Sequence, residues 1–247
     1  MDFPTLVALG AAVFVLAGTI KGLVGLGLPT TFIGVMSQVT DPRTAIALGL
    51  VPMIVTNGWQ AARQGQILAT LRSYAPFIAA LMLFGGVTAA MAVSASDRFI
   101  HGVMGLVIVL FVAVNATLRV PPLPARWDRP AQIVAGVMAG VMGGITSVWA
   151  PPMAVYLAAR HTPPEEFVRA TGVMIFFGAL PLAAAYAQAG MFDARLGLAS
   201  AVLVLPALAG FSLGERLRRR LSAARFRTVL LAVFLAMGLN LIRKALA

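Results

Sequence analysis

The 247-residue sequence contains no cysteine and little charge. Without cysteine the chain can form no disulfide, no thiolate metal site and no thiol nucleophile. Charged residues make up 11% of the chain and hydrophobic residues 60%, whereas soluble domains carry about 25% charged residues. So few charges cannot cover the surface of a soluble domain of this size, which excludes a soluble enzyme, a disordered chain and a coiled coil. The composition predicts an all-α polytopic membrane protein.

Acidic residues are the scarcest charged type, with 8 against 19 Lys and Arg. They all lie in predicted loops or at the ends of apolar runs: Asp2, Asp41, Asp97, Asp128, Glu165, Glu166, Asp193 and Glu215. Proton pumps and cation-coupled carriers usually need a carboxylate inside the membrane, whereas an anion exporter needs none. We assign the basic excess to cytoplasmic loops and anionic lipid headgroups rather than to nucleic acid. We expect no cofactor, metal site or catalytic residue, because His101 and His161 have no metal-ligand spacing.

Six apolar runs are long enough to cross a bilayer as helices. They are residues 43–60, 74–93, 99–118, 167–188, 194–213 and 226–242. Two further apolar regions, 4–38 and 131–160, are interrupted by Gly and Pro, which weaken a helix. Each interrupted region has the length of two half-helices separated by a break.

The two interruptions are about half a chain apart, and four residues coincide when the halves are aligned. The coinciding pairs are Gly18 with Gly140, Gly22 with Gly144, Pro29 with Pro151 and Pro42 with Pro164. The pattern predicts an internal duplication of four helical segments, with repeat 1 over 1–118, a basic Pro-rich linker over 119–130 and repeat 2 over 131–247. Interrupted segments at matching positions of two halves indicate a transporter binding site.

The distribution of Lys and Arg favours repeats of opposite orientation, because the arginine-rich run at 216–227 predicts a cytoplasmic loop. If each interrupted region is re-entrant, each repeat crosses three times, and 13 basic residues lie inside against 5 outside, with Lys21 left out of the count. If each region crosses fully, the repeats are parallel and the numbers are 10 and 8. The stronger bias predicts inverted repeats with both ends of the sequence outside.

The two breaks carry the residues that we expect to bind a substrate. At a break, backbone N–H and C=O groups lose their helical partners, and a half-helix N-terminus directs N–H donors and a positive dipole end at the gap. Proline stands at or near the first position of each following helix, where its missing N–H is tolerated. The candidate substrate-binding residues are Lys21, Gly25, Gly27, Pro29, Thr30, Thr31, Asn57, Thr146, Ser147, Trp149, Pro151 and Pro152.

Each candidate also has a structural interpretation. Gly and Pro can serve helix packing or a kink alone, and Ser, Thr and Asn can bond one helix to another. Lys21 is the only formal charge clearly inside an apolar run, and it either binds or gates a substrate or extends its long side chain to the surface. Gly143 occupies the matching position of the second half, so any role of Lys21 is asymmetric. Glu165 and Glu166 are expected to charge the first turn of a helix.

The breaks read Gly22-Leu-Val-Gly25-Leu-Gly27-Leu-Pro29 and Gly144-Ile-Thr146-Ser147-Val-Trp149-Ala-Pro151-Pro152. With both repeats and the linker, they resemble the TauE/SafE family of sulfite and organosulfur-anion exporters. The sequence departs from the family pattern at Val148-Trp149-Ala150, where a glycine cluster is usual, and at Leu28, where a third glycine is common. A Trp at the break would narrow the cavity or stack on a substrate.

The resemblance implies a multi-pass protein of the cell inner membrane that moves sulfite, sulfonates, thiosulfate or related anions. We therefore expect an exporter of a small anion, most simply sulfite or an organosulfonate, bound near the midplane between the two breaks. With the cell interior negative, expelling one negative charge gains about 2.3 kcal/mol per 100 mV. A channel-like or metal-cation permease is the alternative interpretation. The sequence does not indicate the oligomeric state.

Overall fold

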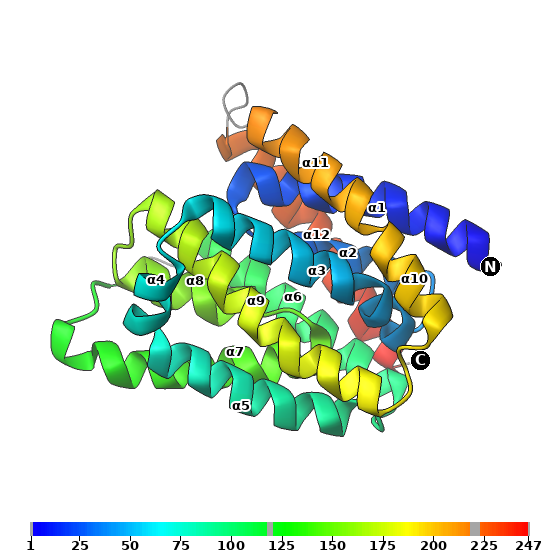
Figure 1. Ribbon diagram of the computed structural model, residues 1–247, viewed down its shortest axis with the longest axis horizontal. Coiled ribbons are helices and arrows are strands. Elements are labelled where there is room, and N and C mark those ends of the chain that lie inside the picture. The colour runs from blue at the N-terminus through cyan, green and yellow to red at the C-terminus, as the bar shows by residue number, and fades with distance from the viewer. Residues whose placement is uncertain (1, 118–120, 218–222, 247) are drawn as a thin grey trace.

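The computed structural model describes residues 2–117, 121–217 and 223–246, and every regular element in these ranges is a helix. The α-helices are α1 (Phe3–Val24), α2 (Leu28–Met36), α3 (Pro42–Gln64), α4 (Ile67–Ser73), α5 (Ala75–Ala92), α6 (Asp97–Thr117), α7 (Asp128–Thr146), α8 (Ala150–Ala159), α9 (Pro164–Gln188), α10 (Ala194–Val202), α11 (Val204–Leu217) and α12 (Ala223–Leu246). A short 3₁₀ helix, η1 (Ala125–Trp127), precedes α7. The expected all-α architecture is confirmed, and both chain ends lie at the same end of the bundle (Figure 1).

The described helices include six that are long and apolar enough to cross a bilayer. They are α1, α3, α5, α6, α9 and the stretch Ala194–Leu217 that contains α10 and α11. Their outer faces expose large apolar side chains such as Leu83, Leu106 and Leu198, which suits contact with lipid. The chain is therefore a multi-pass membrane protein.

Each interrupted region is a long helix followed by a short one. Helix α1 has 22 residues and α2 has 9, and α7 has 19 and α8 has 10. At 1.5 Å per residue α1 is about 33 Å long, enough to cross the hydrocarbon core by itself. The prediction of two half-helices is therefore wrong for α1. The helix continues through Gly22 because the glycine packs directly against the backbone of α11 around Phe211, which offsets its weak helix propensity.

Two other predicted runs are divided or preceded by a turn. The run 194–213 is split at Leu203 into α10 and α11, and a separate helix, α4, ends at Ser73, with Tyr74 between it and α5. Pro206 and Pro76 follow these turns within three residues. Each proline lacks the N–H that would bond to the carbonyl four residues earlier, which explains why one continuous helix does not form.

Two predictions fall partly outside the described residues. Of the linker predicted at 119–130, residues 119–120 are not described, and the remainder contains η1 and the first three residues of α7. Of the arginine-rich run at 216–227, residues 218–222 are not described.

Glycines bring two pairs of helices into backbone contact. A Cβ atom on Gly18 or Gly22 of α1 would lie 2.4 or 2.3 Å from a backbone oxygen of α11. A Cβ atom on Gly140 or Gly144 of α7 would lie 2.8 or 2.5 Å from a backbone oxygen of α5. Only glycine permits such close approach of two helices, a packing typical of membrane bundles. The four glycines that align between the two halves therefore make the same kind of helix crossing.

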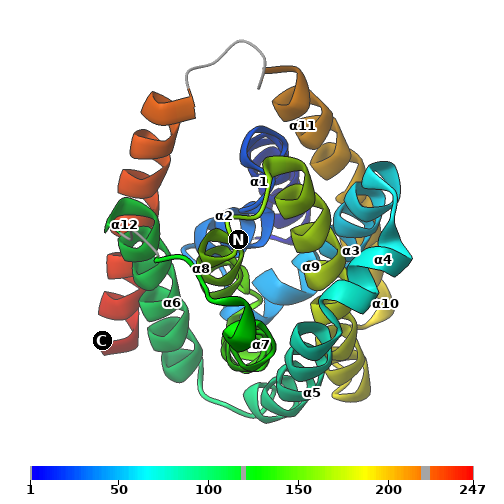
Figure 2. The same cartoon turned by 90° about the vertical axis from the view of Figure 1, so that its left-hand side faces the viewer.

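Neighbouring helices differ in direction. Along α1–α11 and α5–α7 the numbers of neighbouring residues rise together, so these pairs are parallel. Along α3–α9 and α6–α12 one number falls as the other rises, so these pairs are antiparallel. The contacts that establish these directions are Gly10–Leu203 and Gly22–Phe211 for α1–α11, and Gly136–Phe77 and Gly144–Gly85 for α5–α7. They are Gly58–Phe176 and Gly172–Ala61 for α3–α9, and Gly102–Ala245 and Gly105–Gly238 for α6–α12. In the end-on view of Figure 2 the short helices α2 and α8 lie inside the ring of longer helices.

The Ser200 hydroxyl forms hydrogen bonds with backbone groups of α3 that Pro52 leaves unpaired. Pro52 has no N–H to donate to the carbonyl of Leu48. The Ser200 hydroxyl on α10 donates to that carbonyl at 2.9 Å and accepts the Val51 N–H at 3.1 Å. Ser200 therefore satisfies backbone groups that the proline leaves free, and it fixes α3 against α10.

Candidate functional site

The first break is a tight reversal between α1 and α2 that is built on two glycines. Gly25 has a φ of +85° and Gly27 a φ of +101°, a region that other residues rarely adopt. The Gly25 N–H donates to the Lys21 carbonyl at 2.7 Å and closes the end of α1. Helix α2 begins at Leu28 with Pro29 in its first turn, as expected. No described side chain caps this start, so N–H donors at the break remain without a side-chain partner.

Lys21 lies four residues before Gly25 and is 1% exposed. Its ammonium group donates to the amide oxygen of Asn57 on α3 and lies 6.0 Å from the ring centre of Phe211 on α11. Within the described residues no carboxylate forms an ion pair with it. The side chain therefore does not extend to the surface, and among the described residues its ammonium group meets a neutral amide and an aromatic ring but pairs with no carboxylate. Such a group is costly unless something supplies negative charge.

Two amide side chains on the same face of α3 border the first break. Besides accepting from the lysine, Asn57 donates to the Met53 carbonyl at 2.7 Å. Gln60, one turn later, donates to the Val168 carbonyl on α9 at 2.6 Å. Val168 covers Gly25, where an added Cβ atom would lie 2.9 Å from its side chain. Gln60 was not among the candidates, although its position three residues after Asn57 on one helix face was a usable signal.

Several buried oxygen atoms on α2 and α3 have no hydrogen-bond partner in the described part of the chain. They are the hydroxyls of Thr31 and Thr56 and the amide oxygen of Gln60. Thr30, beside Thr31 in the first turn of α2, is also buried. Because buried polar atoms nearly always have a partner, these oxygens are available to water or to a bound ligand.

The second break repeats the first left-handed position of the first break but not the second, since Trp149, which aligns with Gly27, has a φ of −96°. Ser147 has a φ of +61°, and its N–H donates to the Gly143 carbonyl at 2.7 Å. The Thr146 hydroxyl donates to the Met142 carbonyl at 2.7 Å and accepts the Val148 N–H at 3.2 Å. These two bonds occupy the Thr146 hydroxyl with the backbone of the break itself.

Trp149 fills the space over Gly143. A Cβ atom on Gly143 would lie 1.9 Å from the indole Nε1, and one on Gly178 of α9 would lie 3.2 Å from it. The indole N–H is buried without a partner among the described residues, and so is the Ser147 hydroxyl. The second break therefore offers one N–H donor and one hydroxyl, and neither carries a formal charge.

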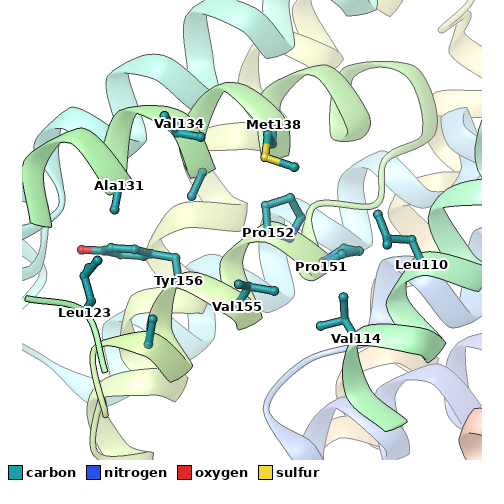
Figure 3. Close-up of a pocket in the computed structure, with 12 residues that line it drawn as sticks. Leu110, Val114, Leu123, Ala131, Val134, Met138, Pro151, Pro152, Val155 and Tyr156 are labelled. Atoms are coloured by element: carbon teal, nitrogen blue, oxygen red, sulfur yellow. The ribbon is translucent and has the colours of Figure 1, made fainter. Parts of the chain in front are cut away.

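Pro151 and Pro152 stand in the first turn of α8, as expected. Their rings line a pocket of about 310 Å³ between α6, α7 and α8, together with apolar residues such as Leu110, Val134 and Met138 (Figure 3). The two rings are therefore in surroundings that suit hydrocarbon rather than an anion.

The two breaks lie at different levels of the bundle. Gly25 contacts Val168 on α9, whereas Trp149 contacts Gly178, ten residues further along the same helix. Ten residues of α-helix span about 15 Å. The described contacts therefore form two clusters of candidate residues, one at each break, rather than a single one.

The profile of the sulfite exporter TauE/SafE family matches residues 10–241, which include both breaks. The chain belongs to the TauE/SafE sulfite exporter family. Over 246 residues it is 24% identical to a protein of Cupriavidus necator described as a probable sulfite/organosulfonate exporter TauE. That alignment covers 97% of this chain and 95% of the relative. No solved structure matches the chain. The predicted family resemblance is confirmed, and the chain is a membrane protein of a transporter family.

A second pocket of this TauE/SafE chain lies beside the first break. It has a volume of about 350 Å³ and is lined by the last residue of α1, Val24, and by the α8–α9 turn and the start of α9, including Thr162 and Val168. The Thr162 hydroxyl is buried. The pocket is at the end of the bundle where Arg63 pairs with Glu215 at 2.7 Å. Its lining residues Val24 and Val168 both adjoin Gly25, so this pocket lies next to the first break.

The acidic residues of the TauE/SafE chain all lie at helix ends, as predicted. Asp41 and Asp193 cap the starts of α3 and α10, and Glu165 and Glu166 lie in the first turn of α9. Among the described residues no three His, Asp or Glu side chains gather in a way that could hold a metal ion.

Proposed function

We propose that the chain exports a small sulfur oxyanion, sulfite or an organosulfonate, across the cell inner membrane, and that the anion binds first beside Lys21. The observation that carries this proposal is the buried Lys21 ammonium group, which is bonded to the neutral amide of Asn57 without a carboxylate partner in the described ranges. A bound anion would supply the missing countercharge. The family, and the description of the Cupriavidus necator relative as a sulfite/organosulfonate exporter, support this substrate class.

The groups around the first break suit the oxygen atoms of such an anion. The start of α2 supplies N–H donors and the positive end of a helix dipole. Thr30 and Thr31 add buried hydroxyls in the same turn, and Asn57 holds the ammonium in place. Hydrogen bonds between a charged donor and an oxyanion are about twice as strong as neutral ones. In this proposal Gly25, Gly27 and Pro29 shape the backbone, and Lys21 provides the charge.

We propose the second break as the next binding site of the anion along its transport path. Ser147 and Trp149 offer unpartnered donors about 15 Å further along α9. Thr146, Pro151 and Pro152 shape the backbone there, since the Thr146 hydroxyl is already bonded to it. The anion would pass from a charged site to a neutral one, which favours its release.

We propose further that residues 1–118 and 131–247 are inverted repeats. Both halves contain a long helix, a break, a short buried helix and then longer helices. The corresponding helices α3 and α9 pack antiparallel, and so do α6 and α12. A two-fold axis in the membrane plane makes corresponding helices antiparallel, whereas parallel repeats would leave them parallel. Rocking of one repeat against the other then provides alternating access.

The proposed orientation places the end with Arg63 in the cytoplasm and both chain ends outside. The pocket beside Val24 and Val168 then opens toward the cytoplasm, which suits entry of a substrate that is to be exported. With the cell interior negative, release of one negative charge outside is favourable by about 2.3 kcal/mol per 100 mV. In this proposal no cofactor takes part.

The test is the thermal stability of the purified protein in detergent with a panel of salts at equal ionic strength. The panel contains sulfite, thiosulfate, a small sulfonate, sulfate, acetate and divalent cations. A ligand that binds only the folded state stabilises it by about 2.7 kcal/mol at one hundred times its Kd. We expect sulfite or the sulfonate to raise the midpoint.

The variant Lys21→Met tests whether the stabilisation depends on this lysine. Lys244→Met is its control, because it removes the other of the two lysines in the chain. We expect Lys21→Met to reduce the sulfite-induced shift strongly and Lys244→Met to keep it. If only divalent cations stabilise the protein, the anion proposal fails and a cation permease takes its place.

A further inference from the structure

The apolar pocket beside Pro151 and Pro152 opens to the outside of the bundle. Leu110, Val134 and Met138, which line it, are among the exposed large hydrophobic residues. In a membrane such a pocket faces hydrocarbon and not water. Along α7 its lining runs from Ala131 to Met138, seven residues or about 10 Å, which is the length of a segment of acyl chain.

One end of this pocket is formed by Leu123 and Ala131, and the segment between these residues carries η1 (Figure 3). Arg126 and Arg129 in this segment are exposed, and neither forms an ion pair within the described ranges. Trp127 between them is 53% exposed. Exposed tryptophan is typical of the headgroup level of a membrane, so this end of the pocket is placed at the bilayer surface.

Within the described ranges no acidic residue neutralises the two arginines. The nearest acid in sequence, Asp128, accepts from the Tyr156 hydroxyl at 2.9 Å and pairs with Arg160 at 3.5 Å. Asp128 is therefore engaged by other partners. Two free guanidinium groups at the mouth of an apolar groove match a molecule with an anionic head and a hydrocarbon tail.

We propose that this groove is a specific site for an anionic phospholipid. One acyl chain lies in the groove against Pro151 and Pro152, and the phosphate is bound by Arg126 and Arg129. Because the two prolines form the first turn of α8, directly after the second break, the bound chain also supports that break. The proposal does not depend on which anion the protein transports.

The test counts lipids retained by the intact protein in native mass spectrometry. Delipidated protein is given phosphatidylglycerol or phosphatidylcholine with identical acyl chains. Each basic residue at a membrane surface contributes about 1 kcal/mol to binding of anionic lipid, so two arginines predict a preference for phosphatidylglycerol of roughly tenfold or more. Equal retention of the two lipids would overturn the proposal.

Two variants separate the headgroup from the chain. Arg126→Gln/Arg129→Gln should lower retention of phosphatidylglycerol to that of phosphatidylcholine, and Arg72→Gln/Arg216→Gln, which changes two exposed arginines of the same end, should not. Ala135→Phe should fill the groove and lower retention of both lipids, whereas Ala90→Phe on the exposed face of α5 should not.

Inorganic phosphate distinguishes a lipid site from a simple anion site. We expect millimolar phosphate to leave phosphatidylglycerol bound, because the chain contributes to binding. Displacement of the lipid by phosphate, or full retention in the Ala135→Phe variant, would show that the groove is not the site. The arginine pair carries the test by itself if Ala135→Phe does not fold.

Discussion

The two breaks of this chain share a backbone arrangement and differ in their side chains. In each, the residue after a long helix adopts a left-handed conformation, Gly25 in one and Ser147 in the other. Each donates its N–H to the carbonyl four residues earlier, that of Lys21 or Gly143, at 2.7 Å. A short helix with proline in its first turn follows both. The two breaks therefore share the end of the long helix and the start of the short one, whereas the left-handed Gly27 of the first break aligns with Trp149, which has a φ of −96°.

The two breaks have their large side chain and their glycine at opposite positions. When the halves are aligned, Lys21 coincides with Gly143 and Gly27 coincides with Trp149. The first break has a buried cation before it and a glycine within it, whereas the second has a glycine before it and an indole that fills the space over that glycine. We infer that the first break selects for charge and the second for size and hydrogen bonding.

The largest expected effect is a loss of stability, and it tests the close helix crossings that precede both breaks. Gly22→Ala and Gly144→Ala each put a Cβ atom at 2.3 or 2.5 Å from a backbone oxygen of the neighbouring helix. Because backbone cannot move aside cheaply, each should destabilise the fold by about 3 kcal/mol. Thermal unfolding in detergent measures this. Gly86→Ala is the control, since its nearest atom would be at 3.4 Å. Tolerance of one substitution but not the other would show that the two crossings are not equivalent.

The next effect tests how the breaks differ. Lys21→Met should weaken sulfite binding by about 2 kcal/mol, roughly thirtyfold in Kd, because it removes a charged hydrogen bond. Trp149→Phe should weaken sulfite binding at the second break by only about 1 kcal/mol, since it removes one neutral donor. Isothermal titration measures both. A larger loss in Trp149→Phe than in Lys21→Met would reverse the proposed division of roles.

A smaller effect concerns the residue at the left-handed position. Ser147→Gly should stabilise the protein by about 1 kcal/mol, because glycine adopts a positive φ without the strain that a side chain brings. Gly25→Ser should destabilise it by at least as much, since it adds this strain and a contact with Val168. Unfolding midpoints compare the two. Destabilisation by Ser147→Gly would mean that the serine hydroxyl itself holds the second break.

The smallest effect tests the separation of the two clusters. Groups about 15 Å apart without shared partners should act independently. In the double variant Lys21→Met/Trp149→Phe, the sulfite affinity of each site should therefore fall by the same amount as in the corresponding single variant, within about 0.5 kcal/mol. A coupling energy above about 1 kcal/mol would instead place Lys21 and Trp149 on the same bound anion.

The breaks could be located from the sequence because their signals are local. Gly25 and Gly27 permit the left-handed conformation, and Pro29 marks the first turn of a helix wherever it stands. The length of α1 could not be predicted in this way, because it depends on a contact between residues far apart in the sequence. Gly22 weakens a helix by itself, and only its contact with α11, which is remote in sequence, shows that the helix continues.

The composition of the candidate site was predictable, but its arrangement was not. Lys21 is conspicuous as a charge in an apolar run, whereas its bond to Asn57 joins residues 36 positions apart and depends on how α1 packs on α3. The placement of Trp149 over Gly143 depends likewise on how the chain turns between them. Local rules describe the break, and the packing of the bundle decides which side chains meet there.

The most direct test of the central claim supplies Lys21 with a countercharge of its own. Asn57→Asp places a carboxylate where the ammonium now meets an amide. We expect this variant to be at least as stable as the parent and yet to lose sulfite efflux from proteoliposomes, because the internal ion pair takes the place of the anion. Asn115→Asp on α6 is the matched control and should keep efflux. Undiminished sulfite efflux by a folded Asn57→Asp variant would contradict the account.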